Sequence, residues 1–280
     1  RCLRLPPAGT TGKPKSIVHG WGVLVNQLKE HKLHLDVETS SRMLFFTTCG
    51  WMMWNWSLAA LGVGATLVLY DGAPILPDDP PVLFRLAAVE EVTHFGTSAG
   101  YLTALEGMSC DVAQVFRDGV KKLAKKTIRK VMVTGSSSSA ANFQFVRDQL
   151  GADVQYVSMS GGTDINSCFA LGCPLKPVII EQLQCRALGA DVAVHDDDGN
   201  EIVEQLGELV CRNAIPAMPL LFWNDEHFEA YRGAYFKMSD KVWRHGDFAE
   251  ITREKGRCNS GRALQSVVRI CRTDCEGGGS

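Results

Sequence analysis

The sequence predicts an α/β fold in which helices cover a mostly parallel sheet, accompanied by a smaller β-rich subdomain. Apolar strands alternate with helical segments along the first part of the chain, which is typical of a parallel sheet. Several strands are continuous apolar runs, as expected where both strand faces are buried. Near residue 187 the pattern changes to alternating strands joined by turns, which predicts a second kind of sheet.

The first elements precede a proline-rich loop. Apolar residues at helical spacing predict a helix over 20–34. The 28 residues 43–70 carry no charge, which is long enough for a membrane span. Glycines interrupt this run, and its end is rich in β-branched residues, so two strands (Met43–Thr48 and Ala65–Tyr70) around a buried helix (Trp51–Leu61) are favoured over a span.

The elements that follow repeat the same order. Helices are expected at Val82–Val89, Ala99–Leu105 and Asn142–Leu150, with strands at Thr93–Thr97, Ile128–Val133 and Val154–Ser158. The loops after Val133 and Ser158 lie at carboxyl ends of strands, where ligands bind in parallel sheets. We therefore divide the chain into an α/β part (1–186), a β-rich subdomain (187–255) and a divergent or disordered tail (256–280).

Composition excludes several classes of protein. Of the 280 residues, 45% are hydrophobic and 21% are charged, which argues against a largely disordered chain. The net charge of −2 provides no global positive field for nucleic acid. The basic stretch Lys121–Lys130 lacks interleaved aromatic residues and is interpreted as a solvated helix face.

The ten cysteines indicate a reducing compartment. They form no Cys-x-x-Cys pair, and the seven histidines do not cluster with them, so a thiolate zinc site is not expected. The opening residues contain prolines instead of an apolar signal sequence. We therefore expect a cytosolic location.

A glycine-rich loop opens the chain. Residues Gly9–Lys15 combine two glycines with two hydroxyls and two ammonium groups, a composition suited to binding phosphate. The spacing is not that of a Walker A loop. On composition alone, a surface turn is an equally good interpretation.

This loop and several later segments resemble the acyl-adenylate-forming enzymes. The match narrows to acyl-CoA synthetases and, within them, to the acetoacetyl-CoA synthetase branch. It is carried by Gly9–Gly20, Thr47–Trp56, Leu69–Pro74, Ser160–Asp164, Gln184–Gly189 and Trp243–Asp247. The resemblance implies part of the large N-terminal domain of such an enzyme. It also implies ATP, Mg²⁺ and CoA as cofactors or co-substrates, with no nucleic-acid or membrane partner.

The resemblance implies roles for individual residues. ATP and acetoacetate would form an acyl-AMP and pyrophosphate, and the CoA thiol would then displace AMP. Thr163 would contact the α-phosphate and Asp164 would bind Mg²⁺, although a simple turn or helix cap is the alternative for this pair. The nucleotide site would comprise Thr10, Thr11, Gly12, Lys15, Gly135, Ser136, Gly162, Thr163, Asp164, Asp247 and Arg262.

The same resemblance implies an acyl pocket. Gly161 stands where acetate-activating relatives carry a tryptophan, so glycine would leave room for a longer acid such as acetoacetate. Trp51, Met52 and Trp54 would line the pocket, with packing in the core as the alternative for these three side chains.

The sequence also departs from the family pattern. Pro7-Ala8 replaces the two serines that begin the phosphate loop, and the match ends after Arg262. The family's mobile C-terminal domain, which carries a catalytic lysine, is not recognisable. We therefore expect a partial chain that is weak or inactive alone. The alternatives are a non-catalytic ATP- or AMP-binding remnant and an acyl-CoA synthetase for another short-chain acid.

Overall fold

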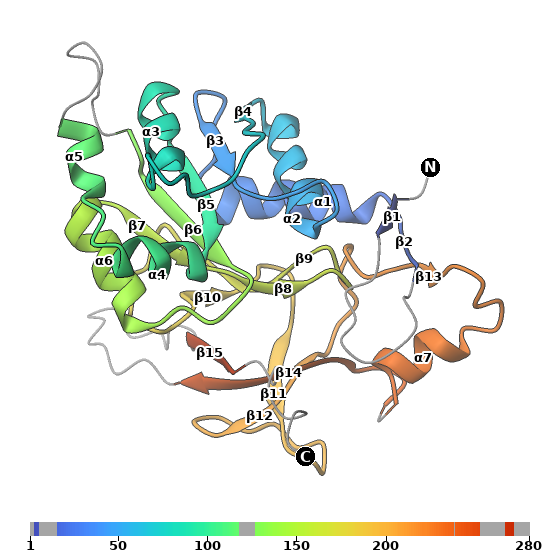
Figure 1. Ribbon diagram of the computed structural model, residues 1–280. Coiled ribbons are helices and arrows are strands. Elements are labelled where there is room, and N and C mark those ends of the chain that lie inside the picture. Colours follow the sequence, from blue (N-terminus) through green and yellow to red (C-terminus); the bar gives the residue numbers. More distant parts are fainter. Residues whose placement is uncertain (1–2, 6–15, 118–126, 238, 253–266, 272–280) are drawn as a thin grey trace, which may run out of the picture. The chain divides into compact units, whose positions relative to one another are not determined.

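Short apolar strands alternate with short helices up to about residue 158 in the computed structural model, and strands predominate after that (Figure 1). The structure describes residues 3–5, 16–117, 127–237, 239–252 and 267–271. Two compact units interleave along the sequence. The parallel-sheet unit comprises Gln27–Met159 and Gly172–Glu181, and the antiparallel unit comprises Arg1–Asn26, Ser160–Leu171 and Gln182–Ser280.

Five parallel strands form the sheet of the parallel-sheet unit, in the order β4-β3-β5-β6-β7. Successive side chains point to opposite faces, so Leu44 and Phe95 face one core while Met43 and His94 face the other side. Gly96 is required in this sheet because a Cβ there would lie 2.0 Å from the Phe45 ring. The strands are β3 (Arg42–Phe45), β4 (Thr66–Val68), β5 (His94–Ser98), β6 (Lys130–Thr134) and β7 (Gln155–Ser158).

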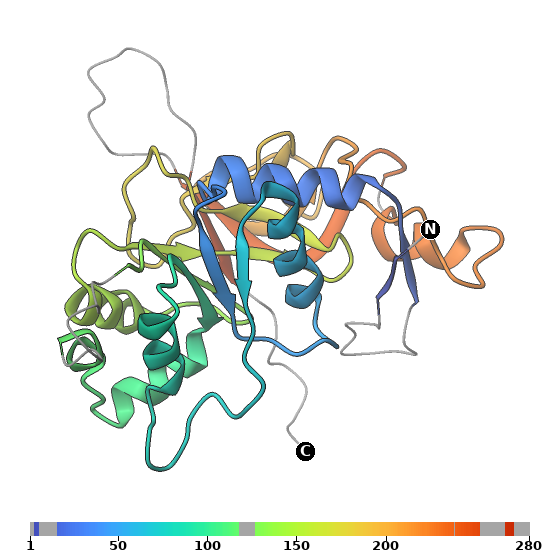
Figure 2. The ribbon, with the colours of Figure 1, turned by 90° about the horizontal axis from the view of Figure 1, so that it is seen from above.

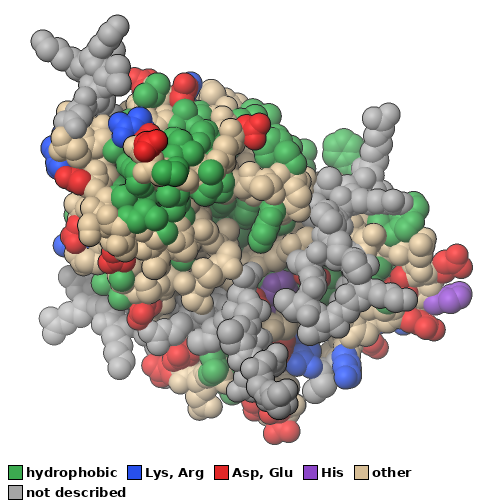
Figure 3. Space-filling view, in the orientation of Figure 1, with side chains coloured by type: hydrophobic (Ala, Val, Ile, Leu, Met, Phe, Trp, Pro, Cys, Tyr) green, Lys and Arg blue, Asp and Glu red, His purple; other side chains and the backbone are tan. Residues whose placement is uncertain are grey.

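One face of this sheet is covered by helices α3 (Val82–Val89), α4 (Ala99–Gly107), α5 (Val112–Arg117) and α6 (Ala140–Leu150). Figure 2 shows α3, α4 and α6 on the same side of the strands. The Ser98 and Ser139 side chains accept hydrogen bonds from backbone N–H groups in the first turns of α4 and α6, which fixes where these helices begin. Figure 3 shows hydrophobic side chains gathered on the outer surface of this unit around α3.

The opposite face is covered by α1 (Gly22–Lys29), the π-helical turn η1 (Glu30–His34), α2 (Met52–Leu58) and the 3₁₀ turn η2 (Ala59–Val63). Buried polar groups lie here in a connected set. The Trp56 indole N–H donates to Glu30 Oε2 at 2.8 Å, and the His31 ring lies 4.1 Å from the Trp56 ring. Burial lowers the pKa of His31 and of His94 to about 4, so both rings are neutral at pH 7.

The antiparallel unit contains three small sheets around its own core. Their strand orders are β1-β2-β13, β10-β9-β8 and β11-β12-β14-β15. The strands are β1 (Leu3–Leu5), β2 (Ile17–His19), β8 (Ser160–Gly162), β9 (Ser167–Leu171), β10 (Cys185–Arg186), β11 (Val192–His195), β12 (Leu206–Cys211), β13 (Leu221–Phe222), β14 (Trp243–Thr252) and β15 (Val267–Cys271). Helix α7 (Glu229–Tyr235) and the first residues of α1 also belong to this unit. Large buried side chains of the core include Ile17, Phe169 and Trp243.

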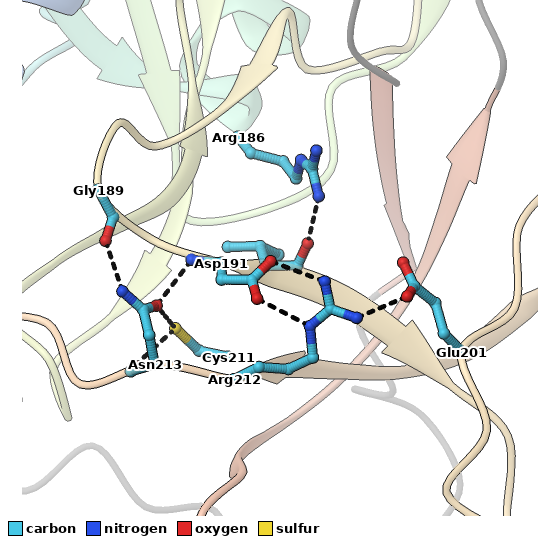
Figure 4. Close-up of polar contacts among 8 residues, drawn as sticks. Arg186, Gly189, Asp191, Glu201, Cys211, Arg212 and Asn213 are labelled. Carbon is cyan, nitrogen blue, oxygen red and sulfur yellow. Dashed lines mark hydrogen bonds and ion pairs between the residues drawn. The ribbon is translucent and has the colours of Figure 1, made fainter.

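A polar network centred on Arg212 and Asn213 connects the segments that flank β11 and β12 (Figure 4). Arg212 donates to both carboxylate oxygens of Asp191, at 2.9 and 2.8 Å, and to Glu201 at 2.5 Å. Asn213 accepts from the Asp191 backbone N–H and donates to the Gly189 carbonyl. The Arg212 guanidinium lowers the pKa of the Asp191 carboxyl, and the network joins the segments before and after β11.

The predicted α/β class and parallel sheet are confirmed, and helix 82–89 has its predicted bounds. Ser160–Gly162, predicted as a loop, forms strand β8 because it pairs with β9. The solvated-face interpretation is wrong for Lys130, which is buried and donates to Gln155 Oε1 at 2.5 Å, whereas Lys121 and Lys122 lie outside the described residues. Nowhere in the described chain is a helix both long and apolar enough to cross a membrane.

Candidate functional site

Thr163 and Asp164 lie on the turn of the β8–β9 hairpin. The Asn166 N–H donates to the Thr163 carbonyl at 3.2 Å and closes the turn. Asn166 adopts a φ of 46°, a left-handed conformation that asparagine tolerates. Ile165, which lies between Asp164 and Asn166, is fully buried in the core of the antiparallel unit. This anchor leaves the Thr163 and Asp164 side chains half-buried at the surface of the turn.

The Asp164 carboxylate is held by a tyrosine from a distant part of the chain. Tyr235, at the end of α7, donates its hydroxyl hydrogen to Asp164 Oδ1. The Tyr235 ring is buried and stacks on Trp243, with ring centroids 3.7 Å apart and planes 15° apart. Burial, together with the nearby carboxylate, raises the pKa of Tyr235. The hydroxyl therefore keeps its proton and acts as a donor.

His19, the last residue of β2, lies beside the same turn. Its side chain is buried, and the carbonyls of Ala217 and Thr163 lie near the ring. Neither ring nitrogen makes a well-formed hydrogen bond with the described residues. Burial lowers the pKa of His19, which favours the neutral ring. Interaction with the Ala217 and Thr163 carbonyls offsets part of this effect, so the ring has backbone partners, although neither contact has good hydrogen-bond geometry.

Strand β14 carries the third group of polar side chains. His245 Nε2 lies 3.7 Å from Asp247 Oδ2, and the edge of Phe169 packs against the His245 ring. The intervening Gly246 adopts a φ of 90°, and its N–H donates to Glu208 Oε1 at 2.9 Å. Glu208 also accepts from Arg244, so one carboxylate fixes the backbone and a side chain on both sides of His245.

The two glycines before Thr163 are needed for close packing. A Cβ at Gly161 would lie 2.0 Å from the Ser167 carbonyl oxygen of β9, so no side chain fits without a backbone shift. A Cβ at Gly162 would lie 3.0 Å from the His245 ring, which connects the hairpin with β14. Strand packing is thus a sufficient reason for glycine at 161, and its role in an acyl pocket stays a prediction.

Gly135 and Ser136 belong to the parallel-sheet unit and directly follow β6. Gly135 adopts a φ of 96°, a conformation that favours glycine, and Ser136 is exposed. The neighbouring serines have structural partners: Ser139 caps α6 and Ser138 bonds the Tyr156 hydroxyl at 2.8 Å. This loop, predicted to belong to the nucleotide site, therefore leaves Ser136 exposed, while Ser138 and Ser139 contribute to the fold.

The predicted pocket aromatics lie at the start of α2. Trp51 is 68% exposed, and Met52 and Trp54 are half-buried. Packing in the core is therefore the wrong interpretation for Trp51. The buried residues of this helix are instead Met53 and Trp56, on the other side of the same turns.

Five predicted site residues lie outside the described part of the chain: Thr10, Thr11, Gly12, Lys15 and Arg262. Their roles stay predictions from the sequence. The described site therefore consists of the hairpin turn with Tyr235 and His19, together with the His245–Asp247 segment of β14.

Comparison with known proteins decides the family. A sequence profile described as "AMP-binding enzyme" matches residues 8–219. The chain belongs to this family. Over 257 residues it is 47% identical to an acetoacetyl-coenzyme A synthetase from Rhizobium meliloti (strain 1021), covering 91% of this chain and 38% of that protein. It is 40% identical over 250 residues to an acetoacetyl-CoA synthetase from Mus musculus, covering 89% and 36%.

Solved structures agree with this AMP-binding assignment. An acetoacetyl-CoA synthetase from Streptomyces lividans superposes with a TM-score of 0.84 at 38% identity, over 97% of this chain and 40% of that chain. The anthranilate CoA ligase AuaEII, in complex with anthranoyl-AMP, shares the fold with a TM-score of 0.72 at 18% identity, over 89% and 44%. The resemblance inferred from the motifs is confirmed, and the chain spans about two fifths of the length of these relatives.

Sequence reasoning missed two residues at this candidate site. His19 ends an apolar strand, and a histidine in such a strand was a detectable signal. Tyr235 had no local signal, since its contact with Asp164 depends on how α7 packs on Trp243. Both residues touch or adjoin the turn that carries the predicted Thr163-Asp164 pair.

The donor set at the turn fits a magnesium ion that arrives with phosphate. Among the described residues, no group of three or more His, Cys, Asp or Glu side chains is placed to hold a metal. Mg²⁺ usually keeps several waters and binds through one or two carboxylates plus substrate phosphates. Asp164, with Oδ1 held by Tyr235, provides a single oriented carboxylate of that kind.

Proposed function

We propose that this chain is the nucleotide-binding part of an ATP-dependent acid–CoA ligase that activates acetoacetate. The observation that carries the proposal is the Asp164 carboxylate, oriented by Tyr235 on an anchored turn next to His19. Membership of the AMP-binding family and the similarity to acetoacetyl-CoA synthetases support the reaction class. The acid carboxylate would attack the α-phosphate of ATP, releasing pyrophosphate, and the CoA thiolate would then displace AMP.

Each residue has a proposed part in binding or orientation. Thr163 would donate a hydrogen bond to the α-phosphate, and Asp247 would accept hydrogen bonds from the ribose hydroxyls. Mg²⁺ bound through Asp164 would neutralise negative charge on the phosphates. Outside the described residues, Thr10, Thr11, Gly12 and Lys15 would hold the leaving pyrophosphate, and Arg262 would contact the nucleotide. Gly135, Ser136 and Gly162 complete the proposed nucleotide set.

Nucleotide binding is tested by calorimetry with MgATP. Asp247→Asn keeps the shape of the side chain but removes its charge, so we expect MgATP affinity to fall about tenfold or more, equivalent to about 1.4 kcal/mol. Asp240→Asn is the matched control because Asp240 is an exposed aspartate in the same unit. Equal affinity of wild type and Asp247→Asn for MgATP would refute the proposed ribose contact.

The acid specificity is a separate question. Packing against the β9 backbone already explains the glycine at position 161. The presence of this glycine is therefore no evidence for acetoacetate over another short acid. A second candidate function is therefore an acyl-CoA synthetase for a different short-chain acid. Acid-dependent ATP–pyrophosphate exchange with acetoacetate, acetate and a branched short acid distinguishes them. Exchange that is fastest with acetoacetate supports the first candidate, and faster exchange with another acid supports the second.

A further inference from the structure

The Tyr235 ring is held by packing against other aromatic side chains, and its hydroxyl reaches the hairpin turn. Its ring is 4% exposed, stacks on Trp243 and meets Phe222 edge to face, with centroids 5.6 Å apart. A tyrosine has two side-chain torsions, and packing of this kind restricts both. Packing by Phe222 and Trp243 therefore fixes the direction in which the hydroxyl points.

Asp164 depends on that hydroxyl for its orientation. The hairpin anchors the backbone of the turn through the buried Ile165, but this anchor does not by itself fix the half-buried Asp164 side chain. Among the described residues, Tyr235 is the hydrogen-bond partner of this carboxylate. The bond engages Oδ1, which leaves Oδ2 as the oxygen available to a ligand.

We propose that Tyr235 is a positioning residue for metal–nucleotide binding: its hydroxyl holds Oδ1 of Asp164 and presents Oδ2 to the Mg²⁺ that accompanies ATP. This inference rests on the proposed function, because it assumes that Asp164 binds that ion. Hydrogen-bond partners of a metal-binding carboxylate orient it, and removing such a partner commonly weakens metal binding 10- to 100-fold. A purely structural hydrogen bond would instead affect the fold and leave metal dependence unchanged.

The test compares Tyr235→Phe with Tyr231→Phe. Tyr231 lies on the same helix and in the same aromatic cluster, but its hydroxyl donates to the Pro219 carbonyl at 3.0 Å. Both variants lose one hydrogen-bonded hydroxyl and keep the ring, and near-UV circular dichroism with urea titration verifies that each is folded. The readout is the ratio of the ATP dissociation constant in EDTA to that in excess Mg²⁺.

We expect Tyr235→Phe to lower this ratio about tenfold while leaving ATP affinity in EDTA unchanged. Tyr231→Phe should keep the wild-type ratio. In an Asp164→Asn background, Tyr235→Phe should have no further effect, because the carboxylate that it positions is gone. An unchanged ratio in Tyr235→Phe, or an equal loss in EDTA and in Mg²⁺, would overturn the inference.

Failure of the proposed function gives a different result. In that case wild type itself binds ATP no better with Mg²⁺ than in EDTA, and Asp164→Asn behaves like wild type. That outcome removes the metal role of Asp164 and overturns the positioning role of Tyr235 with it. A wild-type ratio that depends on Asp164 but not on Tyr235 overturns the positioning role alone.

Discussion

The buried histidines of the two units differ in their hydrogen bonding. In the parallel-sheet unit, His31, His34 and His94 each have a ring nitrogen 2.8–2.9 Å from a backbone carbonyl oxygen. In the antiparallel unit, His19 has no well-formed hydrogen bond among the described residues, and His245 has Asp247 at 3.7 Å. All five side chains are largely or fully buried.

This difference separates structural histidines from candidate functional ones. A ring bonded to the backbone fixes an element in place, as His94 fixes Leu35 to the central strand β5. A buried ring whose carbonyl partners are poorly aligned, such as His19, loses its hydration and gains less from the fold, which is tolerated where a ligand completes the site. Burial alone therefore does not mark the site, because it is common to both groups.

The largest expected effect that tests this contrast is acid destabilisation. Burial lowers the pKa of His31 and His94 to about 4, whereas the unfolded chain takes up these protons near pH 6.5. The free energy of unfolding should therefore fall as the pH drops from about 6.5 to about 4, by up to roughly 3 kcal/mol for each ring. Urea titrations at pH 7, 5.5 and 4.5 measure this loss.

The control for acid destabilisation is His94→Asn, which should remove one ring's share of the pH dependence. A free energy of unfolding that stays constant between pH 6.5 and 4.5 would show that neither ring is held neutral by the fold.

The next effect compares one substitution in both units. His94→Leu leaves the Leu35 carbonyl and the Thr93 hydroxyl without their ring partner and should lower the free energy of unfolding by about 2–3 kcal/mol. His19→Leu removes two nitrogens without well-formed hydrogen bonds, so its expected effect on unfolding is within about 1 kcal/mol. For MgATP affinity we expect the reverse: His19→Leu should weaken binding more than His94→Leu. Equal destabilisation by both substitutions would remove the distinction between the two groups of histidines.

The smallest effect is expected where hydrogen bonds are complete but exposed. Arg212→Lys loses the two-oxygen contact with Asp191, yet both side chains are more than 30% exposed. We expect a loss of at most about 1 kcal/mol, and less in 0.5 M NaCl, measured by urea unfolding. If Arg212→Lys lowers the free energy of unfolding as much as His94→Leu does, exposed hydrogen bonds stabilise this fold as much as buried ones.

The sequence predicted those elements that have a local signal. Helix Val82–Val89 is apolar at every position except Arg85 and directly follows a proline pair, and strands such as Lys130–Thr134 are rich in β-branched residues and buried, so each pattern specifies its own structure. The short strand Ser160–Gly162 has no such signal, since its extended form comes from pairing with β9. Helix α7 was missed for a similar reason, because its buried face depends on packing against Trp243 and Phe222.

The candidate site was accessible to a similar extent. Motif resemblance pointed to Thr163, Asp164 and Asp247, whose roles stay predictions, while Tyr235 could not be found because no spacing rule connects a turn with a helix from a later segment. The exposure of Trp51 was also hidden, since an apolar run does not reveal which of its aromatics faces inward.

The interleaving of the two units along the chain has a consequence for biosynthesis. The turn carrying Asp164 and the strand ending at His19 belong to a unit whose remaining segments begin at Gln182. At about 5–20 residues per second, the roughly 200 residues between His19 and its neighbour Ala217 take about 10–40 s to synthesise. During that interval β2 can pair with β1, where Leu3 lies opposite His19, but its second partner strand, β13, has not yet been made. The site is thus assembled late in translation, whichever unit folds first.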